Sequence, residues 1–245
     1  MTYTPFFISG ADRPDPWLVT CDHAANTVPP VVPGQTLGLA PEDMARHIAW
    51  DVGAAGVAEA LGEALNAPVI RSNFSRLVID PNRGLDDPTL IMQLYDGTII
   101  PANKSLSAAN MQARIDTCYA PYHAALAKLA ARPGIVILSI HSFTPRLKGR
   151  PPRPWEIGVL SANDRRLADP LLQSLATDFT TPVGDNEPYA GHLPGDAVDQ
   201  HALKHGRPNV LIELRNDLIE TPEGQKEWAH RLAPHLEAAR KTANL

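Results

Sequence analysis

Four short apolar runs in this sequence each end in polar residues whose side chains could do chemistry. Enzymes use imidazole, carboxylate, amide and guanidinium groups to bind metals, move protons and hold carboxylates. Ligands of open α/β sheets bind at the carboxyl ends of strands, so these groups could face one crevice if the runs are strands. The residues are Asp22 and His23, Asp80 to Arg83, His141 and Ser142, and Glu213 to Asp217.

His23 and His141 are the strongest candidates for metal ligands, because each lies just past an apolar run. Two neutral imidazoles and a carboxylate form a zinc site that leaves a fourth position open for water. We choose Asp51 as the carboxylate. Asn26 is uncharged, and Asp22 should point away from its neighbour His23 on an extended backbone. We therefore predict that Zn²⁺ is the cofactor; hydrogen-bonded caps of the strand ends are the alternative for both histidines.

Glu213 stands among apolar residues in the run Val210–Leu214, where an unpaired carboxylate would be costly. Burial should raise the pKa of Glu213 into the range useful for a general base. The alternative is a structural ion pair with Arg215, which would share a face of the strand with Glu213, or with another cation. We predict that Glu213 is the catalytic base.

Amide and guanidinium side chains indicate a substrate that carries a carboxylate. Asn82 and Arg83 suit recognition of a carboxylate, although the segment Asp-Pro-Asn-Arg-Gly is also typical of a turn. Arg215, Tyr189 and His192 are further candidates for contacts with the substrate. For Tyr189 and His192 the alternative is that they fix their own loop.

His201 and His205 are four positions apart on an expected helix and could in isolation chelate zinc. No glutamate follows His201, so the metalloprotease signature is missing. We therefore expect these two histidines to lie on a solvated helix face.

The composition restricts the class of protein. The 245 residues are 44% hydrophobic and 20% charged with a net charge of -5, so a sizeable core is possible and no nucleic-acid or membrane partner is expected. Two cysteines argue against a disulfide scaffold and an iron–sulfur cluster. Neither a phosphate-binding glycine loop nor a G-x-S-x-G elbow is present. With no leader-like start, we expect a cytoplasmic protein.

Apolar runs alternate with stretches of helical spacing, which predicts a three-layer α/β/α sandwich around a mixed, mostly parallel sheet. We expect a single domain over residues 1–245. Helices are expected from Pro41 to about Ala67, from Ser107 to Arg132 with a kink at Pro121, from an N-cap at Asn163, and from Thr221 onward. The expected strands are Trp17–Cys21, Val69–Ile70, Leu77–Ile79, Ile135–Ile140, Ile157–Leu160 and Val210–Leu214.

The chain contains five segments, residues 21–29, 47–54, 80–83, 139–143 and 211–217. In this order they resemble the N-formylglutamate amidohydrolase family. The resemblance implies a zinc-exopeptidase-like fold, since this family is related to zinc carboxypeptidases and succinylglutamate desuccinylases. It also implies zinc, with His23 and His141 as ligands, Glu213 as base and the Asn82-Arg83 pair on the substrate carboxylate. This sequence departs from relatives with a His-x-x-Glu pair, because Asn26 stands in place of the glutamate, and from the Pro-His-Ser-Gly form of the first motif.

We therefore expect a zinc-dependent amidohydrolase that cleaves the amide of a small-molecule N-acyl amino acid, with N-formyl-L-glutamate as the leading substrate. One alternative is a zinc carboxypeptidase or cell-wall amidase that acts on a peptide-like bond. The other is a protein that binds zinc or a ligand without turnover.

Overall fold

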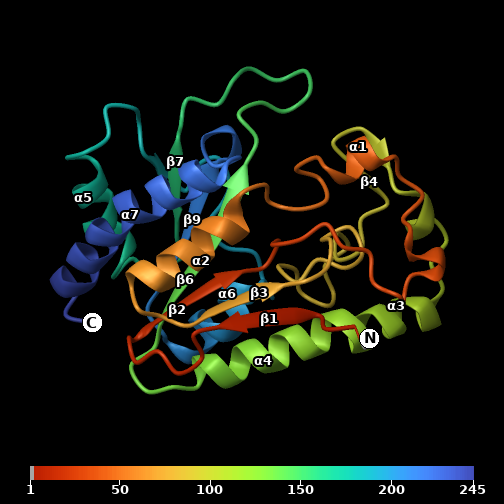
Figure 1. Ribbon diagram of the computed structural model, residues 1–245, viewed down its shortest axis with the longest axis horizontal. Helices are drawn as coiled ribbons and strands as arrows, with labels where there is room; N and C mark the ends of the chain where they lie inside the picture. Colours follow the sequence, from red (N-terminus) through yellow and green to blue (C-terminus); the bar gives the residue numbers. More distant parts are fainter. Residues whose placement is uncertain (1–2) are drawn as a thin grey trace.

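A mixed sheet of seven strands runs through the middle of the computed structural model, which describes residues 3–245 (Figure 1). The strands are β1 (Phe6–Ser9), β2 (Trp17–Cys21), β3 (Val69–Ser72), β6 (Val136–Phe143), β7 (Ile157–Leu160), β8 (Gly184–Asp185) and β9 (Asn209–Arg215). They lie in the order β1-β3-β2-β6-β9-β7-β8. Only β1 with β3 and β7 with β9 pair antiparallel; the other neighbours are parallel, as predicted.

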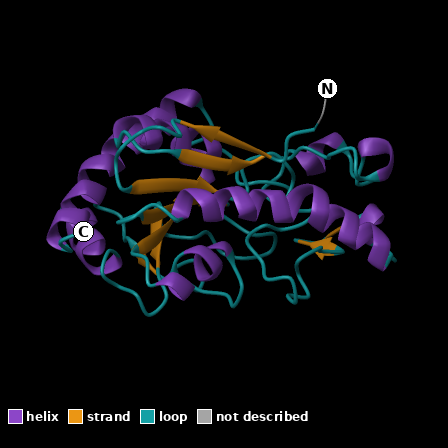
Figure 2. Ribbon diagram, turned by 90° about the horizontal axis from the view of Figure 1, so that it is seen from below, coloured by secondary structure: helices purple, strands orange, loops and turns teal. Residues whose placement is uncertain are grey.

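Helices cover both faces of this sheet, which confirms the predicted α/β/α sandwich (Figures 1 and 2). The alternation of side chains along each strand separates two cores. Trp17 and Val19 of β2 belong to one core, whereas Leu18 belongs to the other. The first core is covered by α2 (Ala54–Ala64), α5 (Ala168–Leu175) and α7 (Pro222–Thr242), and the second by α4 (Ala120–Ala130) and α6 (Ala197–His201).

The shorter elements gather at the right of Figure 1, beyond the sheet. They are α1 (Pro41–Met44), α3 (Ala108–Arg114) and the hairpin of β4 (Leu94–Tyr95) and β5 (Thr98–Ile99). In residues 3–245, no helix combines the length and apolar character that crossing a membrane requires. The single domain over residues 1–245 stays a prediction, and residues 1 and 2 lie outside the described part.

Capping residues begin two helices where the sequence predicts them. The Thr221 side chain accepts a hydrogen bond from the Gly224 N–H at the start of α7, and Ser107 does the same for Asn110 at the start of α3. A π-helical turn, Ile115–Tyr119, joins α3 to α4 just before the predicted kink at Pro121. The predicted cap at Asn163 is wrong, because α5 begins only at Ala168.

The predicted continuous helix from Pro41 to Ala67 is wrong. The chain leaves the helical conformation between α1 and α2, and Gly53 begins α2 with a φ of 81°. A Cβ atom at Gly53 would lie 2.1 Å from the carbonyl oxygen of Ile219, so only glycine fits. The break carries Asp51 to the end of β2, where its N–H donates to the carbonyl of His23 at 2.9 Å. Asp51 therefore precedes the helix instead of lying on it.

The run Leu77–Ile79 is fully buried but is not a strand, contrary to the prediction. It forms a turn whose backbone carbonyls are bound by side chains in place of a neighbouring strand. Asn103 Nδ2 donates to the Leu77 carbonyl at 2.7 Å, and Arg114 Nη1 donates to the Val78 carbonyl at 2.8 Å. An apolar run indicates that a segment is buried, and this buried segment has no neighbouring strand to pair with.

His201 is buried and stacks on His123 of α4, so its predicted place on a solvated face is wrong, whereas His205 is exposed. His123 Nε2 lies 3.0 Å from the Pro81 carbonyl and donates to it. His123 Nδ1 therefore accepts the hydrogen bond from His201 Nε2 at 2.8 Å. The pair links α4 and α6 to the loop that carries Asn82.

This histidine pair should make the protein less stable in mild acid. Burial lowers the pKa of His123 and that of His201 to about 4, so both stay neutral when the unfolded chain takes up protons below about pH 6.5. Stability is then lost as the pH falls from about 6.5 toward 4, by about 2 kcal/mol per histidine between pH 7 and pH 5. Urea unfolding of His201→Gln should show this loss reduced. The exposed His230→Gln is the control; a wild-type pH dependence in His201→Gln would contradict the account.

Candidate metal centre and active site

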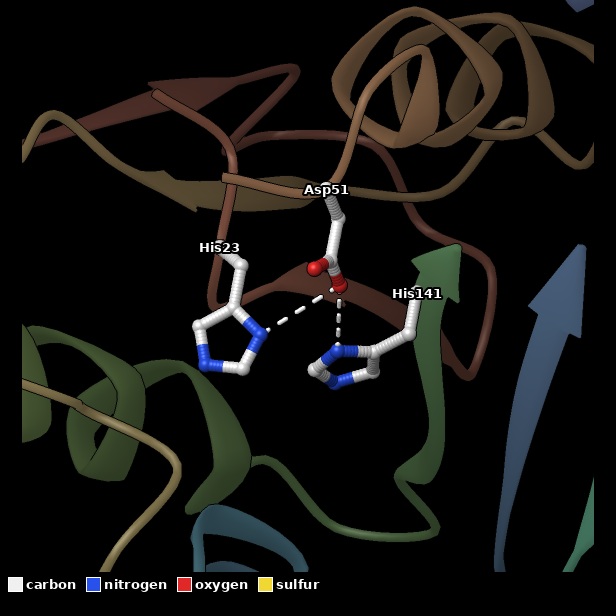
Figure 3. Close-up of side chains that lie close together, drawn as sticks. All are labelled: His23, Asp51 and His141. Atoms are coloured by element: carbon white, nitrogen blue, oxygen red, sulfur yellow. Dashed lines mark hydrogen bonds and ion pairs between the residues drawn. The ribbon is translucent and has the colours of Figure 1, made fainter. Parts of the chain in front are cut away.

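His23, Asp51 and His141 point toward one another at the carboxyl ends of β2 and β6 (Figure 3). His23 Nδ1 lies 3.3 Å and His141 Nδ1 2.8 Å from the same oxygen, Asp51 Oδ2. All three residues are buried, and their ligand atoms lie within 4.8 Å of one another. Ligands of a tetrahedral zinc ion lie about 3.3–3.5 Å apart, given bonds of about 2.0–2.2 Å. A small shift would therefore let one ion contact all three atoms.

The alternative ligands are placed differently. Asn26 turns away, since its Nδ2 donates to the Met44 carbonyl at 2.8 Å. Asp22 lies behind a ligand instead of beside it: its Oδ2 is 3.4 Å from Nε2, the outer nitrogen of His141. The geometry therefore favours Asp51 as the third ligand.

Each histidine has a carboxylate at its outer nitrogen. Asp80 Oδ1 lies 2.7 Å from His23 Nε2, and Asp22 Oδ2 occupies the corresponding place at His141. Metal-bound histidines commonly donate their other ring N–H to a carboxylate, which fixes the ring and leaves the inner nitrogen free for the metal. Asp80 received no predicted role from the sequence; its position two residues before Asn82, the first of the predicted substrate pair, was the available signal.

Arg76 joins the two sides of this cluster. Its Nη2 lies 2.9 Å from Asp80 Oδ2, and its Nη1 lies 3.4 Å from Asp51 Oδ1. Burial disfavours ionised carboxyls, but His23 and His141 outweigh it and hold the pKa of Asp51 well below its usual range. Against burial, His23 and Arg76 likewise hold the pKa of Asp80 well below its usual range.

The charge of the cluster suits a divalent cation. With neutral imidazoles, the three buried carboxylates of Asp22, Asp51 and Asp80 oppose one buried guanidinium, that of Arg76. Three negative charges less one positive charge leave two negative charges, which a divalent cation would balance when both imidazoles bind it in the neutral form. Without the metal, Asp22 and Asp51 raise the pKa of His141 to about 10 against its burial, so its proton takes over part of that balance.

Glu213 lies directly opposite His141, because β6 and β9 are parallel neighbours in this register. It is buried, and its Oε2 atom has no hydrogen-bond partner within residues 3–245. Burial raises the pKa of Glu213 to about 8, although His141 opposes the rise. The alternative of an ion pair is wrong, because Glu213 forms none within residues 3–245. Arg215 Nε donates instead to Asp217 Oδ1 at 2.8 Å.

A cavity of about 420 Å³ opens over these residues. Its size is within the range of small-molecule sites. The cavity is lined by the three metal-ligand candidates, the buried glutamate and three of the predicted substrate contacts: His23, Asp51, His141, Glu213, Asn82, Arg83 and Tyr189. Four further lining residues were not predicted from the sequence: His47, Arg76, Tyr95 and Asp196.

Asn82 and Arg83 present polar groups to the cavity. Asn82 Oδ1 accepts from the Ala197 N–H at 3.2 Å, which leaves the amide nitrogen available. Arg83 donates to the Asn82 carbonyl and to Thr89 Oγ1. Arg83 forms no ion pair with a carboxylate among the described residues, so its charge is available to a ligand.

Two predicted substrate contacts are not placed in this cavity. Arg215 is bound by Asp217 near the end of β9. His192 Nε2 lies 3.4 Å from Asp199 Oδ1 and lines a separate cavity. In both cases a nearby aspartate holds the side chain elsewhere.

The family model for N-formylglutamate amidohydrolase matches residues 15–220. This chain belongs to the N-formylglutamate amidohydrolase family. Membership of the N-formylglutamate amidohydrolase family identifies the chain as an enzyme that hydrolyses linear amides. A comparison with curated proteins found no match.

Solved structures share the fold over nearly the whole chain. A gene product of Agrobacterium tumefaciens is 34% identical with a TM-score of 0.92, over 99% of this chain and 97% of that one. N-formylglutamate amidohydrolase from Ralstonia eutropha is 25% identical with a TM-score of 0.69, over 98% and 97%. A bacteriophage poly-gamma-glutamate hydrolase, 8% identical with a TM-score of 0.51 over 100% and 92%, shares the fold alone.

Proposed function

We propose that this protein is a zinc-dependent amidohydrolase that cleaves the amide of an N-acyl amino acid, with N-formyl-L-glutamate as the leading substrate. One observation carries the proposal. The inner nitrogens of His23 and His141 and one oxygen of Asp51 converge in a cavity that also contains the unpaired carboxylate of Glu213.

The donor atoms support zinc over other metals. Two imidazole nitrogens and one carboxylate oxygen are typical of catalytic zinc, whereas calcium and magnesium prefer oxygen ligands. Asp22 and Asp80 would orient the two histidines, and Arg76 would hold Asp51 and Asp80 in place. When bound, zinc would supply Lewis-acid chemistry, polarising the scissile carbonyl and making water more acidic.

Glu213 performs the proton transfers in this mechanism. Its free Oε2 atom takes a proton from the water that attacks the amide carbon. Glu213 then gives that proton to the amide nitrogen as the C–N bond breaks, which releases the acyl group as a carboxylic acid and the amino acid as a free amine.

Asn82 and Arg83 hold the carboxylate of the substrate, so the scissile amide is oriented toward Glu213. The cavity volume of about 420 Å³ fits a small N-acyl amino acid. We propose such a small molecule as the partner, with neither nucleic acid nor membrane involved and with action in the cytoplasm.

A substrate panel tests this proposal against its alternatives. Purified enzyme with zinc is offered N-formyl-L-glutamate, N-acetyl-L-glutamate and a dipeptide, and amine release is measured. We expect the highest kcat/KM for an N-acyl amino acid. Preference for the dipeptide would favour a carboxypeptidase or amidase. Bound zinc with no hydrolysis of any member would favour a non-catalytic binding protein.

Replacing Asp80 by asparagine should weaken zinc binding. The variant keeps the shape of the side chain but loses the negative charge beside His23 Nε2. Loss of such an outer partner typically costs about 10–100-fold in metal affinity. Competition with a chromogenic chelator measures the affinity. The exposed Asp86→Asn is the matched control; equal affinities in the two variants would refute this role for Asp80.

A further inference from the structure

The cations near the cavity differ in whether a carboxylate neutralises them. Arg76 lies between Asp51 and Asp80 and is neutralised by both. Within residues 3–245, neither Arg83 nor Arg153 forms an ion pair; their side chains donate to hydroxyl or carbonyl oxygens. Two guanidinium groups from two different loops therefore keep a full positive charge.

Arg153 belongs to the loop of residues 144–156, which projects between β6 and β7 at the top of Figure 1. Its Nη1 donates to the Thr144 carbonyl at 3.0 Å, and its backbone N–H donates to the Pro145 carbonyl at 2.9 Å. Its Cζ lies 5.0 Å from the ring centroid of Tyr189 and 5.5 Å from that of Phe143. These contacts fix the guanidinium in one place.

The residues that contact Arg153 also line the cavity of about 420 Å³ that contains the metal-ligand candidates. Phe143, Thr144 and Tyr189 all line it. The charge of Arg153 acts on the catalytic base as well: burial raises the pKa of Glu213, and Arg153 is among the cations that oppose the rise. A fixed guanidinium with free donors, held against aromatic rings without a counter-charge, is suited to bind an anion.

We infer that Arg153 is a specificity-determining residue that binds a second anionic group of the substrate, besides the carboxylate held by Asn82 and Arg83. The inference rests on the proposed function. It means that the enzyme selects N-acyl amino acids with an acidic side chain over neutral ones of equal size. The other cations of this loop, Arg146, Lys148 and Arg150, are exposed and lack the aromatic contacts.

A pair of substrates that differ only in charge tests the inference. The kcat/KM of Arg153→Gln should fall about 10–100-fold for N-formyl-L-glutamate, the worth of a hydrogen bond between charged groups. It should change much less for N-formyl-L-glutamine. Arg153→Lys, which keeps the charge, should recover part of the loss. Arg150→Gln, from the exposed part of the same loop, should behave like the wild type.

Binding without turnover separates this inference from the proposed function. Calorimetric titration should show that Arg153→Gln loses affinity for glutarate, and loses less for the neutral-ended glutarate monoamide. If the wild type hydrolyses neither formyl substrate, the proposed function fails, while glutarate binding still tests Arg153. Equal losses for both substrates and both ligands, equal losses in Arg150→Gln, or no loss in Arg153→Gln would overturn the inference.

Discussion

Replacing Glu213 by glutamine should lower kcat by about 10²–10⁴-fold, the usual contribution of a general acid–base residue. Glutamine has nearly the same shape but cannot take the proton of the attacking water. The change should leave KM nearly unaltered, because Glu213 acts on the water and the leaving nitrogen instead of holding the substrate. Steady-state rates of amine release from N-formyl-L-glutamate measure both constants.

Two further measurements make this result specific to proton transfer. Zinc content should stay at the wild-type level in Glu213→Gln, because Glu213 is not among the three clustered ligand candidates. The exposed Glu220→Gln should keep wild-type rates. If Glu213→Gln retained most of its activity with zinc bound, another group would have to be the base.

Replacing His141 by alanine should remove both the metal and the activity. Only two of the three convergent donors then remain, and Asp22 loses the imidazole that it faces. The loss of zinc affinity should exceed the about 10–100-fold expected for a change in the outer carboxylates. Hydrolysis should fall to background at zinc concentrations that saturate the wild type. Competition titration and rate measurement on the same preparation test the two effects together.

The exposed His205→Ala is the matched control, since it removes an imidazole that lies outside the cluster. It should bind zinc and hydrolyse substrate like the wild type. Circular dichroism is used to check that His141→Ala is folded. Unchanged zinc affinity in folded His141→Ala would exclude this histidine as a ligand.

Much of the sheet was predictable because its strands are buried on both faces and read as apolar runs. The runs at β2 and β7 were predicted with their true bounds, and β9 is one residue longer at each end than predicted. The strand β6 continues three residues beyond its predicted end at Ile140, so His141 lies within the strand and not just past it. The apolar run Leu77–Ile79 was wrongly predicted to be a strand, because side chains of Asn103 and Arg114 bind its backbone in place of a neighbouring strand. Edge strands β1 and β8 were missed, since they are short and partly exposed.

The site was predictable where position along a strand settles it. His141 and Glu213 lie at buried strand positions, and the parallel register brings them face to face. Contacts that depend on how distant loops fold were not readable. The roles of Asp22 and Asp80 behind the histidines follow only from the packed arrangement. Arg215 was assigned to the substrate although the neutralising Asp217 stands two residues away.

Removal and return of zinc shows whether hydrolysis depends on the metal, when bound zinc and formate release from N-formyl-L-glutamate are measured in each sample. Formate release should fall to background as zinc is removed. It should return in proportion to added zinc and reach its maximum at one ion per chain, the capacity of His23, Asp51 and His141. Formate release that persists in metal-free enzyme would refute zinc-dependent hydrolysis of N-formyl-L-glutamate, and so would an enzyme that regains its zinc but releases no formate.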